Sequence, residues 1–129
     1  MGDARELPSR FHAALIARLR EEQDAVVRAQ AGSTARRLPV AQALPLVRAL
    51  ITRDAAAGDP FVPLLCWWTI ESHLAAHRNE VLALFRHEPA VWSRRIVTEH
   101  LAPRLAHRLA ARGTRSELIA LAGLMKSAP

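Results

Sequence analysis

The chain has no tyrosine, one lysine and one cysteine in its 129 residues, and these absences already limit what it can be. A single cysteine, Cys66, excludes an internal disulfide. It lies in the apolar run Leu-Leu-Cys-Trp-Trp, so we expect a buried, unreactive thiol rather than a nucleophile, which needs an electropositive and partly open site. Stretches rich in β-branched and aromatic residues are also scarce, which argues against a strand-based fold.

Long hydrophobic runs are missing as well. The longest, residues 61–70, contains Pro63 and is about half as long as a membrane-spanning helix requires. Residues 1–7 are polar and charged and lack the apolar core of a secretory signal. We therefore expect a soluble chain with no signal peptide and no membrane insertion.

The residues that are abundant favour helices. Half of the chain is apolar, and alanine and leucine, two of the best helix formers, dominate. The length suits one domain with its own core. Apolar side chains recur at helical spacing in seven segments, which lie at about residues 8–21, 24–38, 40–57, 60–76, 78–87, 90–112 and 115–126.

Several of these helices have recognisable start signals. Asp24 and Asp59 are suitable N-caps, and Pro60 fits the first helical position, where a missing N–H costs nothing. Thr114 and Glu117 form a capping box before the last segment. The segment 60–76 is apolar nearly all round, so we expect it to be the central and most buried helix.

Glycine and proline mark the expected ends and irregularities. Gly58 and Gly113 are predicted to end helices in the left-handed conformation. Gly32 weakens the second segment, so a break there is an alternative to a continuous helix. Pro45 and Pro103 are expected to kink the helices that contain them.

These elements predict an all-α fold. Helical hairpins follow one another at intervals of about 30–45 residues, which is the scale of HEAT-type repeats. We expect a HEAT/ARM-like α-solenoid of about six or seven helices, although a compact irregular helical bundle satisfies the same pattern. The expected organisation is a disordered N-terminus at residues 1–7, one helical domain at 8–126 and a frayed C-terminus at 127–129.

No catalytic motif is present. The few serines and threonines have no nucleophile motif around them, and the five glycines form no phosphate-binding loop. His73 and His77 stand four residues apart with Glu80 on the same helical face, a spacing that two ligands of one metal can use. No third ligand follows at a specific spacing, so helix-end or solvated histidines are the favoured interpretation and a metal at His73 and His77 is a distant alternative.

The net charge of +6 comes almost entirely from arginine. The arginines are spread along the chain, which favours solvated helix faces over an anion-binding footprint. The candidates for contacts with an anion or a nucleic acid are those concentrated in the C-terminal third: Arg94, Arg95, Arg104, Arg108, Arg112 and Arg115. Trp67, Trp68 and Trp92 could stack on bases, but tryptophan in an apolar helical run normally belongs to the core.

Three blocks of sequence resemble one protein family. The first comprises Val-Arg-Ala-Gln (27–30), Thr-Ala-Arg-Arg-Leu-Pro (34–39) and Ala-Gln-Ala-Leu-Pro-Leu-Val-Arg (41–48). The second is the run at 59–71, with the pattern Asp-Pro-x-x-Pro-Leu-Leu-x-Trp-Trp, and the third comprises His-Leu-Ala-Pro-Arg-Leu (100–105) and Arg-Gly-Thr (112–114). Together they resemble the HEAT-like region of bacterial membrane-bound-dehydrogenase-like, haem-binding CxxCH proteins, over about residues 20–125.

The resemblance implies an architecture and a role, without chemistry. In that family a propeller similar to sugar dehydrogenases precedes the helical repeats, and a cytochrome c domain follows them. Cys66 is not part of a Cys-x-x-Cys-His motif, so no haem ligand is carried over and haem c is expected only in the family's other domains. The resemblance therefore implies a non-enzymatic connector that contacts protein, through flanking repeats or self-association, and that is exported if it belongs to the full-length family.

Overall fold

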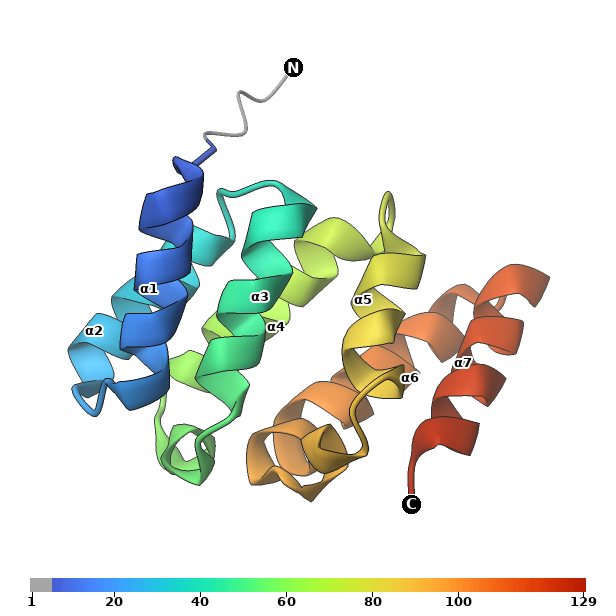
Figure 1. Cartoon of the computed structure of the whole chain (residues 1–129). Coiled ribbons are helices and arrows are strands. Elements are labelled where there is room, and N and C mark those ends of the chain that lie inside the picture. Colours follow the sequence, from blue (N-terminus) through green and yellow to red (C-terminus); the bar gives the residue numbers. More distant parts are fainter. Residues whose placement is uncertain (1–5) are drawn as a thin grey trace.

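The computed structural model describes residues 6–129, and this range contains helices and no strand (Figure 1). The all-α prediction is thus confirmed. The seven main helices are α1 (Ser9–Glu21), α2 (Ala25–Ala35), α3 (Val40–Ile51), α4 (Val62–Leu74), α5 (Arg78–Arg86), α6 (Ala102–Arg112) and α7 (Arg115–Ser127). Two short 3₁₀ helices, η1 (Asp54–Gly58) and η2 (Pro89–Ser93), and one π-helical turn, η3 (Val97–Leu101), connect them. The disorder expected at residues 1–5 lies outside the described range.

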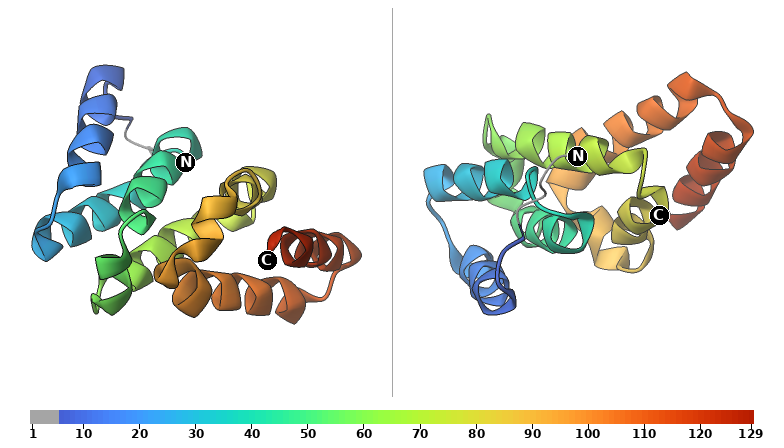
Figure 2. Two further views of the ribbon diagram at one scale, coloured as in Figure 1. Left: turned by 60° about the horizontal axis from the view of Figure 1, so that its bottom comes forward. Right: turned by 90° about the horizontal axis from the view of Figure 1, so that it is seen from above.

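The helices form two rows. α1, α3, α5 and α7 lie side by side in one row, and α2, α4 and the η3–α6 segment lie in the other. Seen from above, the two rows face one another along the length of the molecule, and the chain passes back and forth between them (Figure 2). Within the first row α1 contacts α3, α3 contacts α5 and α5 contacts α7, and in the second row α2 contacts α4, which contacts η3.

The core fills the space between the rows. α3 and α4 contribute seven buried residues each, so the predicted central helix shares that position with α3. Trp67 is 9% exposed and Trp92 half-buried, as expected of core residues, whereas Trp68 is 39% exposed and lies under the guanidinium of Arg36. No helix in the described part of the chain has the length and hydropathy to span a membrane.

Most of the predicted caps are present. The carboxylate of Asp24 accepts from the backbone N–H of Val26 at 2.8 Å, and that of Asp59 accepts from Val62 at 2.8 Å. The hydroxyl of Thr114 accepts from the Glu117 N–H at 3.3 Å. α4 nevertheless begins at Val62, two residues later than expected, so that Pro63 rather than Pro60 occupies its first turn.

Two glycines behave differently from expectation. Gly113 ends α6 with a φ of +63°, as predicted, but Gly58 does not adopt a positive φ because it belongs to η1. The segment 40–57 is accordingly divided, with α3 ending at Ile51. Gly32 does not break α2: a Cβ there would lie 3.0 Å from the Cβ of Leu65, so this glycine permits the close approach of α2 to α4.

The prediction of a single long helix at 90–112 was wrong. Residues 89–93 form η2, and the backbone is extended at Arg94 before a new helical segment begins. Pro103 has no N–H to donate to the carbonyl of Glu99. The chain passes this gap through the π-helical turn, in which the N–H of Ala102 reaches back five residues to the carbonyl of Val97.

Side-chain hydrogen bonds are present near both ends of the described segment. The backbone N–H of Leu7 donates to the side-chain oxygen of Gln42 at 2.8 Å, and the Gln42 amide donates back to the Leu7 carbonyl at 2.7 Å. At the other end, α7 continues to Ser127, whose hydroxyl donates to the carbonyl of Gly123. These three bonds attach Leu7 and Ser127 to the helical part of the chain.

Candidate functional site

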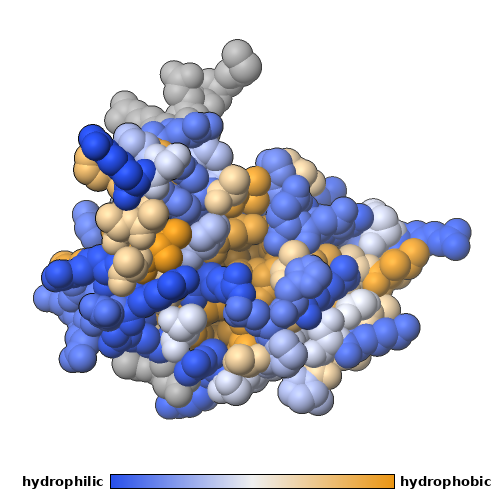
Figure 3. All heavy atoms as spheres, viewed as in Figure 1, coloured by the Kyte–Doolittle hydropathy of each residue, from blue (hydrophilic) through white to orange (hydrophobic). Residues whose placement is uncertain are grey.

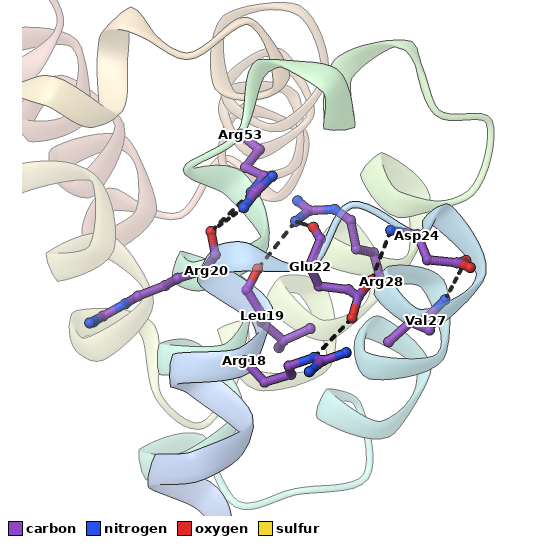
Figure 4. A network of polar contacts seen from close by, with 8 residues as sticks. All are labelled: Arg18, Leu19, Arg20, Glu22, Asp24, Val27, Arg28 and Arg53. Carbon is purple, nitrogen blue, oxygen red and sulfur yellow. Dashed lines mark hydrogen bonds and ion pairs between the residues drawn. The ribbon is translucent and has the colours of Figure 1, made fainter.

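Arg28 is the most buried charged residue that the structure describes, at 4% exposure. Its guanidinium donates to the carbonyl oxygens of Leu19 at 3.4 Å and Glu22 at 3.3 Å (Figure 4). It also donates to the carbonyl oxygen of Leu50 at 2.5 Å. These acceptors lie at the C-terminal ends of α1 and α3, where carbonyls lack partners within the helix and the helix dipole favours a cation. Arg28 therefore connects α2 to two helices of the other row.

A second arginine extends this network. Arg53 donates to the carbonyl of Arg20 through two nitrogens, at 3.0 and 2.5 Å. Burial lowers the pKa of Arg28, and the nearby positive charge of Arg53 lowers it further. All the recorded hydrogen bonds of Arg28 go to backbone carbonyls, so this network holds the fold together and leaves no donor set directed at a ligand.

The sequence contains an indication that Arg28 is buried, although the spacing of apolar residues alone does not show it. Arg28 precedes Gly32 by four residues and Ala35 by seven, so it lies on the small-residue face of α2. A charged residue on that face must be buried and must find acceptors. The acceptors come from α1 and α3, and the spacing of residues in the sequence does not predict that these helices lie beside Arg28.

Cys66 has the environment expected of a structural thiol. It is fully buried in α4, and this burial raises its pKa to about 12. The positive charge of Arg28 acts in the opposite direction but does not compensate. The thiol thus stays protonated at neutral pH and is shielded from reagents.

His73 and His77 do not share one helix. α4 ends at Leu74, and His77 is the residue before α5, with a φ of −133°. Their ring centroids are 6.1 Å apart, and His77 Nδ1 lies 3.8 Å from a Glu80 oxygen. His73 Nε2 is shut off from solvent without a partner, and burial followed by the charge of His77 lowers the pKa of His73. Among the side chains that the structure describes, which exclude those of residues 1–5, 54 and 55, no three are grouped as metal ligands.

The six C-terminal arginines do not form one patch. Three of them pair with carboxylates: Arg95 with Glu99 at 2.9 Å, Arg108 with Glu71 at 3.8 Å and Arg112 with Glu117 at 3.5 Å. Arg94 and Arg95 precede η3, whereas Arg115 begins α7. The structure brings together two members of the set, Arg104 and Arg108, which line one groove.

This groove lies between α4 and α6 and has a volume of about 550 Å³. Its apolar lining consists of Trp67, Pro103 and Ala111, and its polar lining of Glu71, Arg104, His107 and Arg108. Arg104 makes no ion pair with any carboxylate in the described range, whereas Arg108 faces Glu71. The groove thus combines an aromatic wall with an arginine that is available for a ligand.

A smaller hollow lies on the other row, between α3 and α5. Figure 3 shows this side of the molecule, where apolar side chains reach the surface among hydrophilic ones. The hollow measures about 250 Å³, and Leu44, Pro45 and Leu84 contribute its apolar lining. Arg48 and Glu88 line it as well and form an ion pair, which satisfies both charges within the chain.

Both ends of the rows carry exposed apolar side chains. On α1 and α2 these are Phe11, Val26 and Val27, and on α7 they are Leu118, Ile119 and Met125. α7 is buried on the opposite side, through Ala120 and Leu124. α7 thus keeps an apolar surface that no described residue covers, whereas on α1 the guanidinium of Arg10 lies over the ring of Phe11.

Comparison with known proteins assigns nothing further to these surfaces. The resemblance to the HEAT-like region of CxxCH proteins stays an expectation from the three sequence blocks. No protein-family model, no curated protein and no solved structure matches this chain.

Proposed function

We propose that the chain is a non-catalytic, HEAT-like scaffold that binds protein through the ends of its helical rows. The observation that carries this proposal is the apolar surface left on the terminal helices. In a helical-repeat array each unit covers the apolar face of the next, and a terminal unit needs a polar outer face or a further partner. Here the last helix, α7, has an apolar outer face instead, and Phe11, Val26 and Val27 are exposed at the other end.

The outer face of α7 supports this most directly. Leu118 is 47% exposed, Ile119 62% and Met125 68%. Single exposed apolar residues are common, but three on one thirteen-residue helix form a patch of the kind that marks protein contacts. The other sides of the same helix already contact α5 and α6, so this face is where a further helix would pack.

In the larger context we propose the role of a connector in a haem-binding, dehydrogenase-like protein. The haem and dehydrogenase chemistry would then belong to other domains, and this chain would hold them at a set distance. The support is the resemblance of its sequence blocks to that family, together with two rows of helices that a solenoid would share. The reading frames on either side of this chain test the connector role. If they encode neither a propeller nor a CxxCH motif, the role is contradicted.

The scaffold proposal is tested by the oligomeric state of the isolated chain. We expect light scattering coupled to gel filtration to give a molar mass that rises with concentration. Replacing Ile119 and Met125 together by glutamate should keep the chain monomeric, because a charge in an apolar contact is strongly unfavourable. Ala41→Glu, on an exposed position of α3, is the matched control. If the wild-type chain is a monomer at every concentration and the double glutamate variant has the same molar mass, the apolar end is not a contact surface.

A nucleic-acid-binding module is the second candidate. Arg104, Arg108 and Arg112 follow one another at four-residue intervals and so lie on one side of α6, as a phosphate-contacting helix requires. Glu71 and Glu117 pair with two of the three, which favours the scaffold. Duplex binding measured against salt concentration separates the two, and absence of binding at low ionic strength removes this candidate.

A further inference from the structure

The groove between α4 and α6 is lined by a tryptophan, Trp67, whose indole N–H has no partner among the described residues. Trp67 is 9% exposed and lines the groove, yet its Nε1 makes no hydrogen bond within residues 6–129. The half-buried Trp92 shows the usual situation, since its Nε1 donates to the carbonyl of Phe85 at 2.9 Å. An indole N–H in a largely buried ring normally finds an acceptor, so the missing partner of Trp67 requires an explanation.

Solvent reaches this N–H. Among the described side chains, the only nitrogen that lacks both a partner and contact with solvent is Nε2 of His73. The Trp67 Nε1 atom is therefore not sealed off in the core, and Trp67 is one of the residues that line the groove. The donor is open to a molecule that enters from outside.

Two further side chains of the groove are donors that carry a positive charge. Arg104 and Arg108 supply guanidinium groups, which bind carboxylates through two parallel hydrogen bonds. The one carboxylate, Glu71, already faces Arg108 at 3.8 Å. A ligand that fits must therefore bring acceptors with negative charge, and it must also cover the apolar surface of Trp67, Pro103 and Ala111.

We propose that this groove binds an acidic peptide segment of a partner protein. A carboxylate of the segment binds Arg104 and Arg108, a second acceptor takes the Trp67 N–H, and a neighbouring apolar side chain packs on the ring. A volume of about 550 Å³ accommodates a few side chains. The site goes beyond the scaffold proposed above, because it does not use the apolar ends of the rows.

A peptide fits the groove better than a nucleic-acid duplex. A duplex binds through a line of cations directed at successive phosphates. Here the arginines that flank the groove along α6 and η3 pair with carboxylates of the chain, Arg112 with Glu117 and Arg95 with Glu99. Glu71 at the groove itself would repel a polyphosphate backbone, whereas a peptide can place one carboxylate beside Arg104 and turn its other groups away.

Nuclear magnetic resonance of the three indole N–H groups tests the proposal in the intact chain. The probe is a short peptide in which glutamates flank a leucine and a phenylalanine, added up to about 1 mM. We expect the Trp67 resonance to shift in a saturable manner. The Trp92 resonance should stay in place because its N–H is already bonded to Phe85. A peptide with glutamine in place of glutamate should leave Trp67 unchanged.

Arginine variants locate the binding. Arg104→Gln should weaken peptide binding about tenfold, the effect of removing a charged hydrogen bond. Arg115→Gln, on an exposed arginine at the start of α7, should leave it unchanged. The proposal is overturned if Trp67 does not shift, if Arg115→Gln weakens binding as much as Arg104→Gln, or if a short DNA duplex binds the groove more tightly than the peptide. Because the Trp67 shift is independent of oligomeric state, failure here and failure of the scaffold proposal are separate results.

Discussion

A guanidinium nitrogen of Arg28 in α2 lies 2.5 Å from the carbonyl oxygen of Leu50 in α3, and this bond joins the two rows of helices. The carbonyl lies near the end of α3, where it lacks a partner along its own helix. The bond thus serves both the buried cation and the helix end. Its loss should affect three helices at once, since the same guanidinium also binds the end of α1.

Replacing Arg28 by methionine tests this role. Methionine keeps much of the side-chain volume but leaves the carbonyls of Leu19, Glu22 and Leu50 without their donor. We expect the free energy of unfolding, measured by urea titration, to fall by about 2 kcal/mol. Arg37→Met is the matched control, because Arg37 is exposed, and it should change stability by less than about 0.5 kcal/mol. Equal stabilities of the two variants would contradict the structural role of Arg28.

Gly32 offers a test of the contact between α2 and α4. Alanine favours a helix by about 1 kcal/mol over glycine. Here the added Cβ would lie 3.0 Å from the Cβ of Leu65, an atom fixed to the backbone of α4. We expect overpacking to exceed the gain, so that Gly32→Ala lowers the melting temperature and costs about 1 kcal/mol.

Gly58→Ala is the counterpart of that experiment. No atom lies within 4 Å of the position of its Cβ, and its φ is not positive. The substitution should be neutral or stabilise the protein by about 0.5 kcal/mol, because alanine reduces the freedom of the unfolded chain. If Gly32→Ala stabilises as Gly58→Ala does, the two helices are less tightly packed at this point than the structure indicates.

Cys66 should make stability depend on alkaline pH. The thiol ionises at its ordinary pKa of 9.0 in the unfolded chain but only at about 12 in the folded one. The folded state thus holds a proton that the unfolded state loses, so the free energy of unfolding falls as pH rises above 9.0. The fall should be about 1 kcal/mol per pH unit. Urea midpoints of wild type and Cys66→Ala, compared on both sides of pH 9, measure it; parallel curves would refute it.

His73 should have the corresponding effect on the acid side. Burial and the charge of His77 lower its pKa from the ordinary 6.5, so the unfolded chain takes up the proton first. Stability contributed by neutral His73 is complete above pH 6.5 and is lost as the pH falls below it. We expect the melting temperature of His73→Gln to fall less than that of the wild type when the pH is lowered from neutral to acidic. His87→Gln, on an exposed histidine, should follow the wild-type curve.

The features that sequence predicts correctly are local ones. The caps at Asp24, Asp59 and Thr114 and the left-handed Gly113 each depend on residues within one helical turn, so spacing identifies them. The end of α3 and the extended residue Arg94 have no such local signal, whereas Pro103 is a local cause of the π-helical turn at 97–101. There the apolar periodicity continues across a change in backbone geometry, and it cannot indicate where that change occurs.

The groove between α4 and α6 is also predictable from the sequence only in part. Arg104 and Arg108 stand out in the sequence as basic residues of one helix, and Trp67 stands out as a core residue of another. Their meeting depends on α4 and α6 lying side by side in one row, which no local pattern encodes. The missing partner of the Trp67 indole is likewise a property of the folded chain, because sequence shows which donors exist but not which acceptors lie near them.

The π-helical turn at Val97–Leu101 also determines the angular phase of α6. Val97, Leu101, Leu105 and Leu109 are all buried and recur every four residues. In a regular α-helix each such step rotates the side chain by about 40° too far, and three steps would carry the last one out of the core. The π-helical turn rotates the chain less per residue than an α-helix does, and it thereby compensates for the excess rotation of one four-residue interval. Removing a single residue from it would turn Leu105 and Leu109 by about 100° relative to the preceding segment and expose them.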